Sequence, residues 1–101
     1  MSTETRIELS RRAEVALERL QPRDRQRIES TLGRLSQSGL SLKDVSKLGA
    51  GARGEIYLIR AGRDLRIIVK KTGDELEVLD IVRHDKLQHA YDTFRHGGGA
   101  G

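Results

Sequence analysis

The sequence predicts a single α+β domain in which a strand and two helices precede a sheet of consecutive strands. Three observations lead to this prediction. Apolar and polar residues alternate over 54–83, and glycines separate the runs, as in β-hairpins. Over 10–38, apolar residues recur instead at the spacing of an α-helix. The chain has 101 residues, of which 36% are hydrophobic, and this suits one modest core.

The first 42 residues predict a short strand followed by two helices. Residues 5–9 alternate between apolar and charged side chains, as a half-buried strand does. Ser10 is suited to cap the first helix, and Pro22 is suited to begin the second. The apolar stripes of the two helices are Ala13, Ala16, Leu17 and Leu20, then Ile28, Thr31, Leu32 and Leu35. Gly39 suits a helix end, so this segment predicts a helical hairpin with one buried face.

Three consecutive strands follow, at 55–60, 65–71 and 76–82. The turns between them contain glycine, so we expect antiparallel hairpins. Alternation gives the first two strands a core face and a surface face. The core face holds Tyr57, Ile59, Leu65, Ile67 and Val69, and the surface face holds Leu58, Arg60, Arg66, Ile68 and Lys70.

The remaining segments are a connection and a C-terminal helix. Residues 40–53 form the connection, which has room for one more short strand. Its glycines spell GxGxxG, but they precede a strand, so no dinucleotide site is predicted. The terminal helix is predicted by an apolar stripe of Leu87, Ala90, Tyr91 and Phe94. We therefore expect one domain over 1–96 and a disordered glycine-rich tail over 97–101.

Positive charge is concentrated in the middle of the chain. Residues 43–71 hold eight basic and three acidic side chains, whereas the whole chain has a net charge of +4. Such a basic zone is typical of a surface that binds nucleic acid, and an ordinary solvated surface is the alternative. Because the chain has only three aromatic residues, we expect no platform for stacked bases. The candidate RNA-binding residues are Lys43, Lys47, Arg53, Arg63 and Lys70.

Several classes of protein and site are not predicted. The chain has no cysteine, so it has neither a disulfide framework nor a thiolate metal site. It shows no membrane-length apolar run and no signal-peptide core, so we expect a cytoplasmic protein without a membrane partner. His84, His89 and His96 are too far apart at helical spacing to share a metal ion. Neither a metal nor any other cofactor is predicted.

The ordered set of segments resembles the RelE/ParE superfamily of toxins from type II toxin–antitoxin pairs. The run IELSRRAEVALERLQPRDRQRIESTLGRL is similar to the opening strand and helical hairpin of that family. The run LSLKDVSKLGAGARGEIYLIRAGRDLRIIVKKTGDELEVLDIVRHDKL is similar to its loop and sheet. Most specific is IYLIRAGRDLRII, which resembles the family's hairpin of a tyrosine, alternating basic and aliphatic residues, a glycine turn and an arginine-led strand. The resemblance covers residues 5–91.

The resemblance implies a RelE-like fold, with a twisted antiparallel sheet packed on the helical hairpin. RelE-like members cleave mRNA on the ribosome without a metal ion and so inhibit translation, whereas ParE-like members inhibit DNA gyrase. Both kinds are neutralised by a cognate antitoxin, for which we expect the stripe of the terminal helix (Leu87, Ala90, Tyr91 and Phe94) to be a binding surface. The partner is then the ribosome with mRNA, or DNA gyrase. An inactive homologue that acts only as a binding module is a third alternative.

The candidate catalytic residues follow from the chemistry of metal-independent RNA cleavage. The 2′-hydroxyl is the nucleophile, and the reaction needs a proton acceptor, cations beside the phosphorane and a donor for the leaving 5′-oxygen. By the resemblance, Arg66 matches the arginine that contacts the phosphate, and Arg60 lies on the same face as a second clamp. His84 and Lys86 fall in the family's basic segment after the last strand, and Tyr91 matches a tyrosine beyond it.

Each candidate also has a purely structural interpretation. The two arginines are able to form ion pairs with Asp64 or Asp80 across the strands. His84 is able to end a strand at the surface, and Tyr91 is able to pack within its helix.

The sequence departs from the family in one respect. Ribosome-dependent members usually have a basic pair on the first hairpin strand, and here Ile56 and Leu58 occupy those positions. Without those cations the 2′-hydroxyl lacks its usual activating group. If the protein is a nuclease, we therefore expect slow cleavage.

Overall fold

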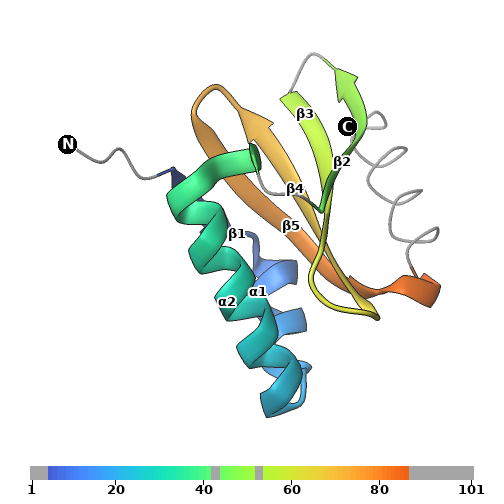
Figure 1. The fold of residues 1–101 in the computed structure, drawn as a ribbon. Helices are drawn as coiled ribbons and strands as arrows, with labels where there is room; N and C mark the ends of the chain where they lie inside the picture. Colours follow the sequence, from blue (N-terminus) through green and yellow to red (C-terminus); the bar gives the residue numbers. More distant parts are fainter. Residues whose placement is uncertain (1–4, 42–43, 52–53, 87–101) are drawn as a thin grey trace.

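The computed structural model describes residues 5–41, 44–51 and 54–86. In this part of the chain, one strand and two helices precede four further strands (Figure 1). The elements in order are β1 (Arg6–Leu9), α1 (Arg11–Arg19), α2 (Pro22–Ser38), η1 (Gly39–Ser41), β2 (Val45–Gly51), β3 (Gly54–Arg60), β4 (Leu65–Thr72), β5 (Glu75–Arg83) and η2 (His84–Lys86). The helices η1 and η2 are single 3-10 turns.

The strands form one sheet in the order β1-β5-β4-β3-β2. Strands β2 to β5 each pair antiparallel with the next strand along the chain, but β1 pairs parallel with β5. The sheet is therefore mixed, and the expectation of a purely antiparallel sheet is wrong. The reason is that no tight turn joins β1 to β5. A turn fixes the direction of neighbouring strands, whereas a strand that is separated from its neighbour by helices is free to pair in parallel.

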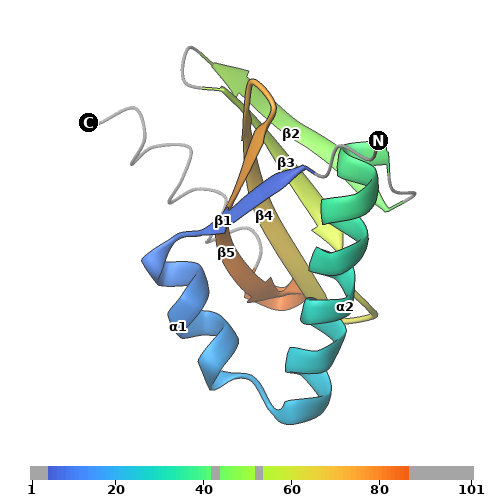
Figure 2. The ribbon, with the colours of Figure 1, turned by 90° about the vertical axis from the view of Figure 1, so that its left-hand side faces the viewer.

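Both helices lie against the same face of the sheet (Figure 1), and seen from the helix side they diverge from the loop that joins them (Figure 2). The core between helices and sheet consists of Ala13, Ile28, Leu35, Ile59, Ala61, Leu65, Ile67, Val69, Leu76, Val78 and Ile81. The predicted core face is confirmed for β3 and β4, with Tyr57 half-buried at its end. Because side chains alternate along a strand, Arg60 and Arg66 lie on the sheet face opposite α1 and α2. The expectation that this face is a surface is wrong for Ile68, which is fully buried, and for Arg66, which is 9% exposed.

Local hydrogen bonds fix the ends of the helices. The hydroxyl of Ser10 accepts a bond from the Ala13 N–H and donates one to the Leu79 carbonyl, so the predicted cap also ties α1 to β5. Gly39 ends α2 with a φ of 60°, as its position predicts. The guanidinium of Arg25 donates to the Leu17, Glu18 and Leu20 carbonyls at the end of α1. Arg25 therefore satisfies the Glu18 and Leu20 carbonyls at this helix end and shares the Leu17 carbonyl with the Leu20 N–H.

Some sequence predictions lie outside the described residues. These are the terminal helix with Leu87, Ala90, Tyr91 and Phe94, and the tail over 97–101. The domain boundary at residue 96 also stays a prediction. Neither of the helices in the described ranges has the length and the apolar character that a membrane crossing requires.

Candidate functional site

The candidate site lies at the end of the sheet where the β3–β4 hairpin turns. Arg60 is the last residue of β3, and it pairs directly with Arg66 of β4. The Ala61 N–H donates to the Leu65 carbonyl at 2.9 Å and closes the turn. Two like charges placed opposite each other destabilise an antiparallel pair. Since the fold nevertheless brings these arginines together, this end of the sheet is suited to an anionic ligand.

A cavity of about 250 Å³ opens between this hairpin and the start of β2. Its lining residues are Asp44, Val45, Ser46, Leu58, Arg60 and Arg66. The Arg60 N–H donates to the Asp44 carbonyl at 2.9 Å, and this bond holds the start of β2 against β3. The cavity thus combines two guanidinium groups with one carboxylate and one hydroxyl. In the part of the chain that the structure describes, no group of three or more histidine, aspartate or glutamate side chains is close enough to hold a metal ion.

Arg66 is the buried cation of this site, with only 9% of its surface exposed. Its Nη1 atom donates to the carbonyls of Leu65 at 2.9 Å and of Gly62 and Arg63 at 3.2 Å. No buried side-chain nitrogen or oxygen among the described residues lacks a hydrogen-bond partner. The described residues provide no acceptor for Nε and Nη2 of Arg66. One edge of the guanidinium thus holds the turn, and the side chain also lines the cavity.

The described residues give neither arginine an ion pair. The ion pairs in this part of the chain join Arg6 to Glu75, Lys47 to Glu55, Lys70 to Glu77 and Arg83 to Asp24. The structural interpretation in which Arg60 and Arg66 pair with Asp64 or Asp80 is therefore wrong within the described residues. The reason is that the turn carbonyls hold Arg66, while Oδ1 of Asp80 accepts the Ile81 N–H at 2.8 Å. Partial burial raises the pKa of Asp80 above its ordinary value.

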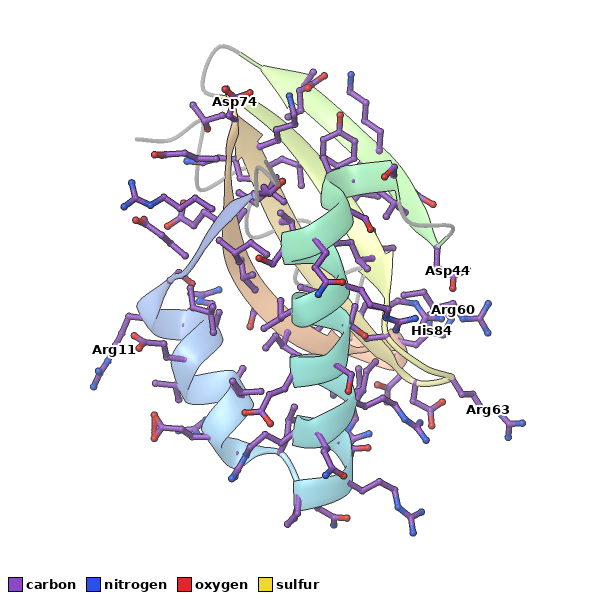
Figure 3. The ribbon with its side chains drawn as sticks, turned by 60° about the vertical axis from the view of Figure 1, so that its left-hand side comes forward. Arg11, Asp44, Arg60, Arg63, Asp74 and His84 are labelled. Atoms are coloured by element: carbon purple, nitrogen blue, oxygen red, sulfur yellow. The ribbon has the colours of Figure 1, made fainter. Side chains whose placement is uncertain are left out.

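His84 and Lys86 follow β5 at the same end of the sheet. The His84 N–H donates to the Asp64 carbonyl at 2.7 Å, so η2 is tied to the β3–β4 turn. In Figure 3, His84, Arg60, Asp44 and Arg63 all lie at one margin of the molecule, and Arg11 lies far from it. Both His84 and Lys86 are exposed. Of the predicted catalytic residues, Arg60, Arg66 and His84 thus gather at one end, Lys86 follows two residues later, and Tyr91 lies outside the described residues.

The predicted RNA-binding residues are more scattered. Arg63 is exposed in the hairpin turn, at the same margin of the molecule as Arg60. Lys47 instead pairs with Glu55, and their hydrogen bond raises the pKa of Lys47 and lowers the pKa of Glu55. Lys70 pairs with Glu77 at 3.6 Å. Lys43 and Arg53 lie outside the described residues.

Asp44 and Ser46 are the cavity residues that the sequence did not point to. They lie in the expected connection, where no strong alternation shows which side chains face the hairpin. The pairing of β2 with β3 also shifts by one residue between Lys47 and Gly49. Such a bulge changes the face of the residues beyond it and leaves no reliable sequence signal.

Leu58 is one of the two positions at which the sequence departs from the basic pair usual in ribosome-dependent members of the family. In the structure, this apolar residue forms part of the cavity wall.

Several solved structures of other proteins have a fold similar to that of this chain. Neither a protein-family model nor a curated protein matches the sequence. Among solved structures, the chain is similar to the RelE–RelB complex of Pyrococcus horikoshii, with a TM-score of 0.69 and 20% identity over 79% of this chain and 94% of the other. It is also similar to the RelB–RelE antitoxin–toxin complex of Methanococcus jannaschii, with a TM-score of 0.67 and 20% identity over 83% of this chain and 98% of the other. The third similar structure is the DinJ–YafQ toxin–antitoxin complex of E. coli, with a TM-score of 0.67 and 21% identity over 82% of this chain and 97% of the other.

These structures share an architecture with this chain over nearly their whole length. At 20–21% identity, the likeness concerns the fold and not the residues of a site. It agrees with the resemblance that the sequence itself shows over residues 5–91. This chain has the α+β fold of the RelE-type toxins of toxin–antitoxin systems.

Proposed function

We propose that this protein is the toxin of a type II toxin–antitoxin pair and that it cleaves mRNA on the ribosome, without a metal ion, to inhibit translation. The observation that carries the proposal is Arg66, a buried guanidinium that has no carboxylate partner in the described part of the chain and opens onto a cavity. Burying a charge without a counter-charge is costly. An anionic ligand such as an RNA phosphate would supply the missing counter-charge.

The arrangement of Arg66 suits stabilisation of a transition state. Its three bonds to turn carbonyls hold the guanidinium in place before any ligand arrives. A positioned cation in a partly dry site stabilises developing charge without reorganisation, and such interactions are often the largest single contribution to catalysis. Arg60, which is exposed and directly opposite, then acts as a second clamp on the phosphate.

Other groups at this end of the sheet supply the proton transfers in the proposal. Asp44 is the carboxylate of the cavity and accepts the proton of the attacking 2′-hydroxyl. His84 donates a proton to the leaving 5′-oxygen, with Lys86 as an additional cation. The ester bond to the 5′-oxygen breaks as the 2′-oxygen bonds to phosphorus, so the products carry a 2′,3′-cyclic phosphate and a 5′-hydroxyl.

The proposal includes a cognate antitoxin as partner. The similar RelE and YafQ proteins were each solved in a complex with such a protein. We propose that the antitoxin of this chain covers the stripe of Leu87, Ala90, Tyr91 and Phe94. A ribosomal target implies a cytoplasmic location.

Inhibition of DNA gyrase is the second candidate function. The observation that favours it is Leu58, which places an apolar wall in the cavity where a nuclease of this kind usually has a cation. With fewer cations, activation of the 2′-hydroxyl is weaker, and the same fold is then left with a binding role.

Two assays on the purified protein separate these functions. Wild-type protein is incubated with ribosomes programmed with a defined mRNA, and cleavage is mapped by primer extension; in parallel, DNA supercoiling by purified gyrase is measured. The proposal predicts slow cleavage and normal supercoiling. Intact mRNA with blocked supercoiling would instead establish the gyrase function, and no effect in either assay would leave only a binding module.

A further inference from the structure

Arg27 of α2 reaches the same hairpin turn from the helix side of the sheet. A β-carbon at Gly62 would lie 2.8 Å from Cδ and 3.0 Å from Nη1 of Arg27, so the arginine side chain lies directly over this glycine. Gly62 has a φ of 103°, a conformation that other residues rarely adopt. The close contact between Arg27 and the turn therefore depends on the absence of a side chain at residue 62.

Three arginines meet at this turn. Arg27 contacts Gly62, Arg63 is exposed in the turn, and Arg66 donates to the Gly62 carbonyl at 3.2 Å. Asp24, which lies about one helical turn before Arg27 in α2, pairs with Arg83 at 3.2 Å. Within the described ranges, neither Arg27 nor Arg63 takes part in an ion pair. The turn contributes one acidic side chain, Asp64, so this corner of the molecule keeps a net positive charge.

We infer that Arg27 and Arg63 form a second phosphate-binding subsite, which holds the nucleotide next to the one at Arg66. The inference rests on the proposed function, because it takes the cavity at Arg66 as the site of the first phosphate. Arg66 links the turn to the cavity, because its Nη1 donates to the Gly62 carbonyl and its side chain lines the cavity. A strand of RNA that leaves the cavity over the hairpin end meets Arg27 and Arg63 next.

The chemistry of the second subsite favours backbone recognition. Guanidinium groups bind phosphate with paired hydrogen bonds, and Arg27 is already positioned by its contact with the turn. Contacts to phosphate position a strand but do not read its sequence. The subsite therefore strengthens binding of any single-stranded RNA that extends beyond the cavity, and it does not select a cleavage sequence.

The test measures how RNA binding depends on salt and on RNA length. The probes are a dinucleotide with one internal phosphate and a hexanucleotide, both with 2′-O-methyl groups that prevent cleavage. For the hexanucleotide, Arg27→Ala should reduce the slope of log affinity against log salt by about 0.7, the value for one phosphate contact on a single strand. Arg27→Lys should restore the slope, since it keeps the charge. The dinucleotide should bind wild type and Arg27→Ala equally.

Arg11→Ala is the matched control, because Arg11 is an exposed arginine on α1 far from the turn (Figure 3). An unchanged slope in Arg27→Ala would overturn the inference, and so would an equal loss with the dinucleotide, which would place Arg27 in the first site. None of these readings requires cleavage. Failure of the proposed function appears separately, as intact mRNA with the wild-type protein.

Discussion

Arg66 uses different nitrogen atoms of one guanidinium for structure and for the proposed ligand. Nη1 donates to three carbonyls of the hairpin turn, while the described residues provide no acceptor for Nε and Nη2. Hydrogen bonds to a charged group contribute about 1.5–3 kcal/mol each when they are removed from a folded protein. Removal of this side chain is therefore expected to lower stability as well as activity. Activity of an Arg66 variant must be compared at a temperature where both proteins are folded.

Asp80 gives a prediction at the same scale. Burial raises its folded-state pKa, so in the acidic range the folded protein binds more protons at Asp80 than the unfolded chain does. Stability from this residue therefore falls as pH rises through the raised pKa. Asp80→Asn removes the buried charge and keeps an oxygen for the Ile81 N–H. We expect the variant to have a higher urea midpoint than wild type at pH 7.

The difference between Asp80→Asn and wild type should disappear at a pH below the ordinary aspartate pKa of 3.8, where both side chains are neutral. Arg12 favours the charged form and acts in the opposite direction, but burial is the larger cause. A wild-type midpoint at pH 7 equal to or above that of Asp80→Asn would contradict this assignment.

At the scale of elements, local sequence rules succeed where a single element determines the result. Spacing and alternation correctly predict the Ser10 cap, the Gly39 helix end and the core face of β3 and β4. They do not predict the parallel pairing of β1 or the bulge in β2. The pairing of β1 depends on a neighbour to which no tight turn joins it. The bulge changes the register within a hairpin in which Gly51 pairs with Gly54, and the alternation of residue types does not mark such a shift.

Two glycines give opposite predictions for the same substitution. Gly33 lies within α2, and a β-carbon there would contact nothing within 4 Å, so Gly33→Ala should stabilise the protein by up to about 1 kcal/mol. Gly54 begins β3 with a φ of 128°, and its β-carbon would lie 2.5 Å from the Lys71 carbonyl oxygen. Gly54→Ala should cost at least about 1–3 kcal/mol. Urea unfolding of both variants tests this, and a shift in the same direction would refute it.

The inward face of α2 offers a graded test of the core. Leu35 is fully buried, so Leu35→Ala should cost about 2–5 kcal/mol of the free energy of unfolding. Leu32 packs against the core but is partly exposed, so Leu32→Ala should cost less. Equal losses in the two variants would show that the face of α2 is assigned incorrectly.

At the scale of the whole molecule, the sequence indicates half of the candidate site. Alternation puts Arg60 and Arg66 on one face because they belong to a single hairpin. It does not reveal that Asp44 and Ser46 of the β2 segment form the other side of the cavity, or that Arg27 of α2 reaches Gly62. These contacts join segments that are distant along the chain. They arise from packing and require the three-dimensional structure.

The central claim is that Arg66 promotes cleavage of mRNA on the ribosome. The most direct measurement is the rate at which ribosome-bound mRNA is cut by wild type, Arg66→Ala and Arg11→Ala, with each variant folded under the assay conditions. We expect Arg11→Ala to match wild type, the new ends to carry a 5′-hydroxyl, and Arg66→Ala to be slower by roughly 10²–10³. An equal rate in Arg66→Ala, or uncut mRNA with the wild-type protein, would contradict the claim.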